Sequence, residues 1–217
     1  MRHCTVGFWN VNCISYKDKN TEAYQFKHQA IQSTDTDILC LSETFLKGDD
    51  AFDIDKYTWI GHNRTDINRK AVRGSGGVGV LLHDRITAMF HYEILDKSHE
   101  GILWIKLTPK MNNGVSLIIC SCYLPPVDTS RPVDAEQFFD ELLCQFSKYQ
   151  NEGLVIIGGD FNARCSDLEE YIAGVDMVMN RQVIDTEYNR YGGAILYFWH
   201  ISIMVVTLKS FKCPSCS

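Results

Sequence analysis

A chain of 217 residues, 45% apolar and 22% charged, has the size and composition of one folded domain with a sizeable core, which excludes a disordered chain. The formal net charge is −6 and the sequence pI is near 5.6, which is unusual for a protein whose affinity depends on neutralising phosphates. The nine cysteines follow no disulfide framework, and the N-terminus lacks the apolar region of a signal peptide. We therefore expect an intracellular protein, in the nucleus or cytoplasm, with reduced cysteines.

Two apolar strands in the first part of the chain each end in polar side chains. Residues 6–8 alternate into Asn10 and Asn12, and the apolar run 38–41 leads into Glu43. Because one predicted helix separates them, the two strands are expected to be parallel and joined by a right-handed crossover. This arrangement places Asn10 and Glu43 at the same edge.

The helix between these strands is predicted over about 20–31. Asn20 can cap its first turn, Phe26 lies on its apolar face, and His28 is expected to face solvent.

The middle of the chain is interpreted as short strands joined by turns. Residues 57–60 and 102–107 have strand composition, and the glycine-rich segment 74–77 is predicted to be a turn that feeds the next strand. A phosphate-binding P-loop is excluded there, because the Lys-Ser/Thr pair is missing and no helix pattern follows.

Two further strands carry polar residues at their ends. The run 115–122 ends at Tyr123, and 154–157 leads through two glycines to Asp160 and Asn162. A simple Asx-turn that closes a strand would also place an Asp and an Asn there. If the four strands lie side by side and point the same way, their polar ends gather along one edge of a sheet, where α/β folds commonly place ligands. These residues are Asn10, Asn12, Glu43, Tyr123, Asp160 and Asn162.

A helix is predicted to begin at Asp134, with Phe138, Leu142 and Phe146 facing the core. The segment 192–208 is apolar apart from three polar residues. It is either a helix packed on the sheet or, at the lower limit of length, a membrane span.

Four basic residues, Arg64, Arg69, Lys70 and Arg73, lie within ten positions that contain one acid, Asp66. Such a cluster is a solvated loop or, beside an edge lined with carboxylates, a docking site for a phosphate backbone.

Five motifs in chain order resemble the endonuclease/exonuclease/phosphatase superfamily. Within it, the chain is most similar to the apurinic-type, reverse transcriptase-associated endonuclease domain at the front of the polyprotein of non-LTR retrotransposons. The motifs are Trp9-Asn10-Val11-Asn12, Ser42-Glu43-Thr44, Gly74-Ser75-Gly76-Gly77-Val78, Tyr123-Leu124-Pro125 and Gly159-Asp160-Phe161-Asn162-Ala163.

The resemblance runs from about residue 4 to about residue 199 and divides the chain into an incomplete domain, 1–200, and a divergent tail, 201–217. It implies a layered α/β sandwich of the deoxyribonuclease-I type, with two mixed β-sheets face to face, helices on both outer faces and the last strands missing.

The same resemblance implies Mg²⁺-dependent (or Mn²⁺-dependent) nicking of DNA that leaves a 3′-hydroxyl. Glu43 would be the principal metal ligand, with Asn12 near the metal through water. Asp160 would orient or deprotonate the attacking water, Asn162 and Asn10 would hold the scissile phosphate and Asp160, and Tyr123 would hydrogen-bond a phosphate oxygen. DNA is the implied partner, without an organic cofactor and without membrane association.

The chain departs from the family after Asp160. The family has a later strand that ends in Asp, and a Ser-Asp-His near the C-terminus, whereas here the only later histidine is His200 and the last acid is Glu187. We therefore expect weak or no activity from this chain. The alternatives are a phosphatase of the same superfamily, or a non-catalytic remnant or binding module, of which a form anchored in a membrane through 192–208 is one variant.

Overall fold

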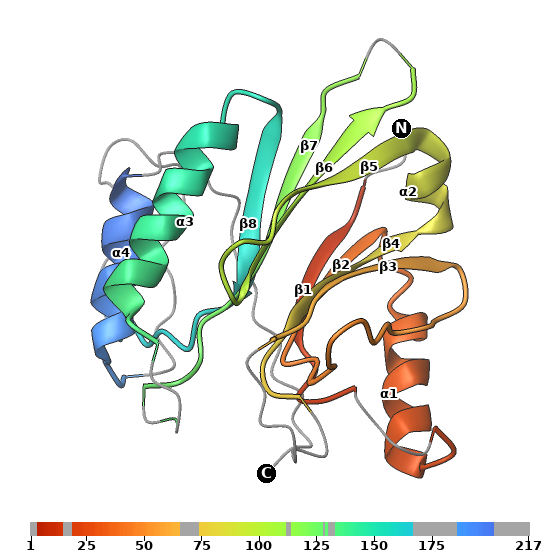
Figure 1. Ribbon diagram of the computed structural model, residues 1–217, viewed down its shortest axis with the longest axis horizontal. Coiled ribbons are helices and arrows are strands. Elements are labelled where there is room, and N and C mark those ends of the chain that lie inside the picture. The colour runs from red at the N-terminus through yellow and green to blue at the C-terminus, as the bar shows by residue number, and fades with distance from the viewer. Residues whose placement is uncertain are drawn as a thin grey trace.

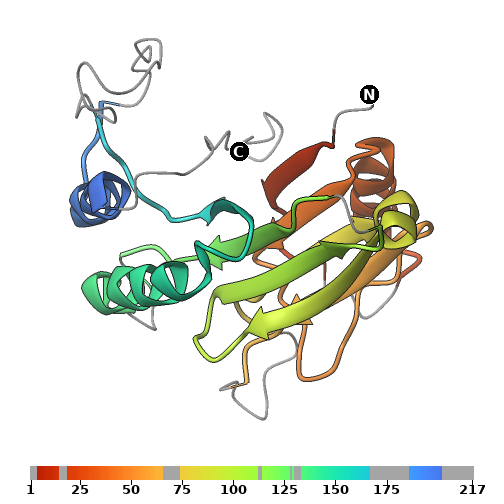
Figure 2. The same ribbon diagram turned by 90° about the horizontal axis from the view of Figure 1, so that it is seen from above.

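The structure is a computed structural model that describes residues 4–14, 19–65, 74–111, 114–127, 129, 133–166 and 186–201. Within these ranges, the strands form two four-stranded mixed sheets, ordered β1-β2-β4-β3 and β5-β6-β7-β8. The sheets stack face to face and helices cover both outer faces (Figure 1), which is also visible from above (Figure 2). The predicted two-sheet sandwich is confirmed.

The first sheet begins with the predicted parallel pair. β1 (Val6–Asn10) lies parallel to β2 (Ile38–Ser42), with Asn10 opposite Ser42, and the crossover helix is α1 (Glu22–Ser33). β4 (Val78–His83) pairs antiparallel with β2 and with the edge strand β3 (Tyr57–His62). The polar ends of β1 and β2 therefore lie side by side.

The second sheet ends in another parallel pair. β5 (Phe90–Asp96), β6 (Ile102–Pro109) and β7 (Leu117–Tyr123) are antiparallel, and β8 (Leu154–Asp160) lies parallel to β7 with Tyr123 opposite Asp160. The short helix α2 (Asp84–Met89) links the two sheets. The sequence predicted neither α2 nor β5.

α3 (Ala135–Tyr149) and α4 (Arg190–Ile201) lie together on the outer face of the second sheet (Figure 1). Asp134 caps α3 by accepting a hydrogen bond from Glu136 N at 3.0 Å. The side chains predicted to face the core are buried. The Phe139 ring packs against the Phe198 ring of α4, with the ring centroids 5.9 Å apart. The buried predicted residues are Phe138, Leu142 and Phe146.

The face of α1 differs from the prediction. Thr21, rather than Asn20, caps the helix, and Phe26 is 63% exposed while Tyr24 is buried. His28 is half-buried rather than turned fully to solvent, because its ring packs near those of Tyr24 and Phe52, with ring centroids 5.7 and 5.9 Å apart. The physical reason is the loop after β2, which packs apolar side chains against the side of the helix and turns that side into core.

The sequence predicted that the polar strand ends lie along one edge of a single sheet. This prediction is wrong. β1 and β2 belong to the first sheet, and β7 and β8 to the second. The two sheets meet where the Phe8 ring covers Gly158, at which an added Cβ would lie 2.4 Å from that ring. All four ends therefore converge at the same end of the sandwich.

Several predictions fall outside the described residues. These are the positions of Arg69, Lys70 and Arg73, and the tail 201–217 apart from residue 201, where α4 ends. In the ranges that the structure covers, no helix is long and apolar enough to cross a membrane.

Candidate active site

Asp160, at the end of β8, is held by neutral hydrogen-bond donors from both sheets. Asn10 Nδ2 donates to one carboxylate oxygen at 2.6 Å, and the backbone N–H of Asn162 donates to the other at 3.0 Å. The backbone N–H of Asn12 donates to Asn10 Oδ1 at 3.0 Å, which fixes the orientation of the Asn10 amide. Asn10 and Asp160 are thus brought together across 150 positions of sequence.

Asn162 is tied to the scaffold by its side chain. It has a left-handed φ of 48°, and its Nδ2 donates to Leu124 O at 2.9 Å. Asn189 Nδ2 in turn donates to Asn162 O at 2.8 Å, while Asn189 Oδ1 accepts from Gly192 N at 3.0 Å in the first turn of α4. Sequence reasoning did not assign Asn189 to the site, although Asn directly before a helix is a capping signal.

Glu43 follows β2 and lies close to Tyr123. The Glu43 carboxylate is half-buried, and its backbone has a left-handed φ of 55°. The Glu43 carboxylate lies close enough to the Tyr123 hydroxyl for its charge to act on that group. Burial raises the pKa of Tyr123 well above its usual value, and the charges of Glu43 and Asp160 raise it further. Tyr123 is therefore a neutral phenol between the two carboxylates.

The glycine-rich segment 74–77 supports the Glu43 loop and leads directly into β4, as predicted. Phe45 N donates to Gly76 O at 2.9 Å, and Gly74 N donates to Phe45 O at 2.9 Å. Gly76 has a φ of +62°, and an added Cβ would lie 3.2 Å from the Tyr123 ring. Glycine is favoured there by the left-handed backbone conformation, and an added Cβ would also press on the Tyr123 ring.

A shallow hollow lies beside Tyr123, with His62, Arg64, Glu100 and Pro125 in its walls. Arg64, from the predicted basic cluster, forms an ion pair with Glu100 at 2.8 Å, and its side chain is 16% exposed. His62 Nδ1 lies 3.1 Å from Ile102 O, and burial lowers the pKa of this imidazole. Arg64 therefore lies near the site, but it already has an acidic partner.

The oxygen donors of the site fit a hard divalent cation. Neither Glu43 nor Asp160 forms an ion pair with another residue in the part of the chain described, and Asn12 is exposed beside them. The described ranges also hold no cluster of three or more His, Cys, Asp or Glu residues suited to a metal. Mg²⁺ commonly uses one or two carboxylates and completes its shell with water and substrate phosphate, so this donor set suits it.

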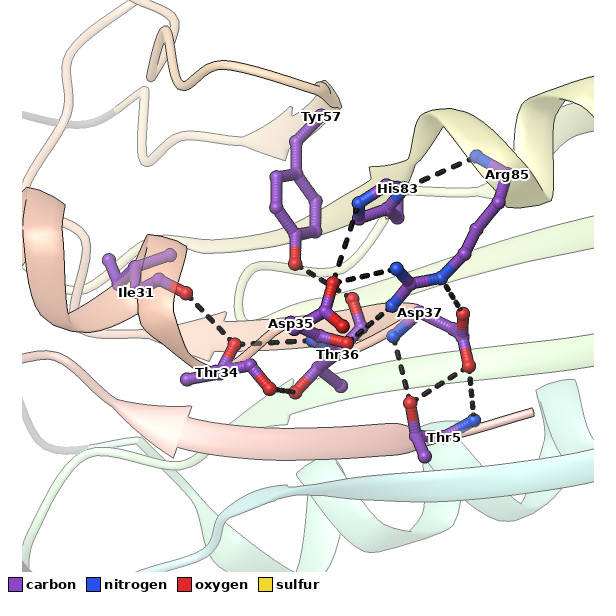
Figure 3. Close-up of polar contacts among 9 residues, drawn as sticks. All are labelled: Thr5, Ile31, Thr34, Asp35, Thr36, Asp37, Tyr57, His83 and Arg85. Carbon is purple, nitrogen blue, oxygen red and sulfur yellow. Dashed lines mark hydrogen bonds and ion pairs between the residues drawn. The ribbon is translucent and has the colours of Figure 1, made fainter. Parts of the chain in front are cut away.

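A second group of charged residues lies at the opposite end of β1 and β2 (Figure 3). Thr5 donates to Asp37 through its backbone N–H at 2.7 Å and its hydroxyl at 2.9 Å, and Arg85 Nε donates to the other oxygen of Asp37. Arg85 Nη1 also pairs with Asp35 at 2.7 Å. Both carboxylates pair with the one guanidinium of Arg85, and this cluster ties the start of β2 to α2.

Solved structures share this architecture. The catalytic domain of Xenopus laevis APE2 superposes with a TM-score of 0.56 at 18% identity, over 89% of this chain and 67% of that one. A truncated Caenorhabditis elegans TDP2 gives 0.49 at 16% identity, over 74% and 63%. ANGEL2, a 2′,3′-cyclic phosphatase, gives 0.46 at 17%, over 74% and 53%. The chain thus spans about two thirds or less of these proteins, and the likeness to APE2 establishes a deoxyribonuclease-I-like fold.

A search of curated proteins finds no match. Residues 7–171 match the family model described as the endonuclease/exonuclease/phosphatase family. This range is more than half of the chain and includes every strand end that contributes to the site. The chain belongs to the endonuclease/exonuclease/phosphatase family.

Proposed function

We propose that this chain is a divalent-metal-dependent phosphodiester hydrolase that nicks DNA, of the type found in non-LTR retrotransposons. Family membership supports hydrolysis of a phosphoester bond. The observation that carries the proposal is the Asn10–Asp160 hydrogen bond of 2.6 Å beside Glu43 and Tyr123. This site combines two carboxylates with neutral donors and suits an anionic substrate that arrives with a cation.

Asp160 is the residue best placed to orient and deprotonate the attacking water. Both of its oxygens accept hydrogen bonds from neutral donors, so its orientation is fixed while its charge stays uncompensated by the described residues. Attack of that water on phosphorus would break the bond to the 3′ oxygen, which leaves as a 3′-hydroxyl after protonation. Asn10 would hold Asp160 in line for this step.

Glu43, with Asn12 acting through water, would hold the Mg²⁺ or Mn²⁺ ion. When bound, such a cation offsets negative charge on the phosphate and on the leaving oxygen.

Tyr123 would contribute a hydrogen bond to a phosphate oxygen. Its raised pKa keeps the phenol protonated at neutral pH, so it remains a donor. The Glu43 carboxylate lies close to this hydroxyl, so substrate would bind beside the candidate metal ligand. Arg64 and the basic residues Arg69, Lys70 and Arg73 would add contacts to the DNA backbone.

Catalysis by this chain alone is expected to be slow. The resemblance implies a histidine that stabilises the pentavalent phosphorus, and the only histidine after Asp160 is His200, without a preceding Ser-Asp. Loss of one electrostatic donor of this kind costs ~100–1,000-fold in rate. Binding of metal and DNA should persist, because Glu43 and Asp160 are retained.

The test compares the purified 217-residue chain with its Glu43→Ala variant. Mn²⁺ binding is measured by titration calorimetry, and binding of a labelled DNA duplex is measured in Ca²⁺ by fluorescence anisotropy. We expect both to weaken in Glu43→Ala, and we expect plasmid nicking in Mg²⁺ by the parent to be no faster than by the variant.

Equal Mn²⁺ binding by the two proteins would overturn the metal assignment. Binding of a nucleotide or inositol phosphate, without binding of the labelled DNA duplex, would assign a phosphatase instead. Clear nicking that Glu43→Ala abolishes would show that the site works without the missing histidine.

A further inference from the structure

Three backbone carbonyls of the loop after β1 converge on the side chain of Lys27, which lies in the middle of α1. Lys27 Nζ donates to Val11 O at 2.6 Å, to Asn12 O at 2.5 Å and to Cys13 O at 2.9 Å. An ammonium group has three donors, one for each of these carbonyls. Lys27 thus fixes the path of the backbone immediately after Asn10.

This loop has an unusual conformation that needs such a partner. Asn12 and Cys13 have φ values of 43° and 80°, so two successive non-glycine residues are left-handed. In that conformation the Cβ atom crowds the following carbonyl, and neighbouring contacts must hold the backbone in place. The Lys27 ammonium supplies those contacts on the carbonyl side of the loop.

The amide side of the same loop pairs with the segment that carries Glu43. Cys13 N donates to Glu43 O at 2.7 Å, and Ile14 N donates to Thr44 O at 3.0 Å. The carbonyl contacts to Lys27 and the amide contacts to Glu43 and Thr44 therefore place the loop between α1 and the candidate metal ligand.

The loop also controls the orientation of Asn10. The Asn12 N–H donates to Asn10 Oδ1 at 3.0 Å, and this contact turns the other end of the amide toward Asp160. Movement of the Asn12 backbone would remove the contact and free the Asn10 amide to rotate. Lys27 thereby acts on Asn10 without contacting the carboxylate of Asp160.

We infer that Lys27 is a positioning residue for the proposed hydrolysis, which sets the loop of residues 11–14 so that Asn10 and Glu43 are correctly presented. The inference rests on the proposed function. A compact ammonium suits convergent carbonyls better than the planar guanidinium of arginine, so Lys27→Arg should replace it only in part.

The test uses Lys27→Met, which keeps most of the aliphatic stem, and measures Mn²⁺ affinity well below the unfolding temperature. We expect an affinity loss of about 10-fold, the lower end for residues that orient metal ligands. Lys27→Arg should show a smaller loss in the same direction. The matched control is Lys106→Met, which removes a lysine with a 20% exposed side chain from its ion pair with Glu152 and should leave the affinity unchanged.

A second readout is the NMR signal of the Asn10 side-chain amide, together with hydrogen exchange of the amides of residues 11–14. The signal should shift and exchange should accelerate in Lys27→Met, with the amides of 154–157 unaffected. If Lys27→Met does not fold, Lys27→Arg carries both measurements.

Two results would overturn the inference. One is a lowered unfolding temperature with unchanged Mn²⁺ affinity, which would reduce Lys27 to a stabilising residue. The other is an unchanged Asn10 amide signal, which decides the matter whether or not the protein binds Mn²⁺. Equal Mn²⁺ affinity of the parent and Glu43→Ala would instead refute the proposed function.

Discussion

The two ends of the β1–β2 pair hold carboxylates in opposite ways. At the starting end, Asp37 is 5% exposed and accepts hydrogen bonds from Thr5 and from the Arg85 guanidinium. At the far end, the hydrogen bonds that Asp160 accepts from the described residues come from neutral donors, Asn10 and the backbone of Asn162. One end of the pair therefore holds a carboxylate bound to Arg85. At the other end, Glu43 after β2 and Asp160 on the facing strand β8 have no cationic partner among the described residues.

The two ends differ in whether the negative charge of a carboxylate is already paired within the protein or is available to bind a cation. Burial alone would raise the pKa of Asp37, but hydrogen bonds from Thr5 and Arg85 outweigh it and hold the pKa below its ordinary value. The folded state therefore favours the ionised form of Asp37, and its negative charge is already paired there. Glu43 and Asp160 have no such partner in the described chain, so a cation from solution can fill that role.

The largest expected effect is on the free energy of unfolding, when Asp37 at the starting end is replaced. Asp37→Ala removes an ionised acceptor and leaves the Thr5 and Arg85 donors unmatched, so the free energy of unfolding should fall by about 2–3 kcal/mol. Urea denaturation measures it. Asp160→Ala is the matched control and should cost less than about 1 kcal/mol, because its half-exposed donors can turn to water. Equal losses in the two variants would mean that the two ends do not differ in this way.

The pH dependence of stability should separate the two ends next. Because the folded-state pKa of Asp37 is lowered, its contribution is present above the unfolded value of about 3.9 and is lost as the pH falls through the folded value. The stability difference between the parent and Asp37→Asn should therefore stay constant from pH 7 to about pH 5 and shrink below about pH 4. A difference that grows on acidification would refute this account.

Metal addition should stabilise the protein through the opposite end only. A cation at about ten times its dissociation constant adds about 1.4 kcal/mol to the free energy of unfolding. Thermal unfolding with Mg²⁺ should show this gain in the parent and equally in Asp37→Asn, but not in Glu43→Ala. A gain retained by Glu43→Ala would place the cation elsewhere.

The smallest effect concerns the ion pair between Arg64 and Glu100 at the rim of the hollow. Its members are compensated like Asp37, but the Glu100 side chain is 42% exposed. A double-mutant cycle with Arg64→Met and Glu100→Gln should give a coupling of about 0.2–1 kcal/mol in urea denaturation. A larger coupling would show that the hollow excludes water more fully than its exposure indicates.

Parts of the fold with a strong local pattern could be predicted from the sequence. The apolar run 38–41 indicated a buried strand, and the spacing of Phe138, Leu142 and Phe146 gave the buried face of α3. The run 154–157 is a strand as predicted, but only alternate residues of it are buried and Leu154 is 46% exposed. The prediction of the buried face of α1 was wrong, because the loop after β2 supplies part of the surface that this helix contacts. β5 was missed because it is an edge strand on which apolar side chains, such as those of Tyr92 and Ile94, remain half-exposed.

In the candidate site, residue types were predictable but their partners were not. The motifs identified Asn10 and Asp160, yet nothing local pairs residues 150 positions apart. Two facing sheets, rather than one edge, bring them together. The contacts of Lys27 are made to backbone carbonyls, whose positions are set by the tertiary fold and leave no pattern in the sequence.

The contact of the Phe8 ring with Gly158 has a consequence for how such sites diverge. Phe8 precedes Asn10 by two residues and Gly158 precedes Asp160 by two, so each pair shares a face of its strand. A ring against bare backbone, with no room for a Cβ, therefore acts as a spacer that sets the gap spanned by the Asn10–Asp160 hydrogen bond. Substitution of Phe8 or Gly158 can widen the gap between Asn10 and Asp160 while every polar residue is retained. An intact set of polar motifs then does not show that the site is intact.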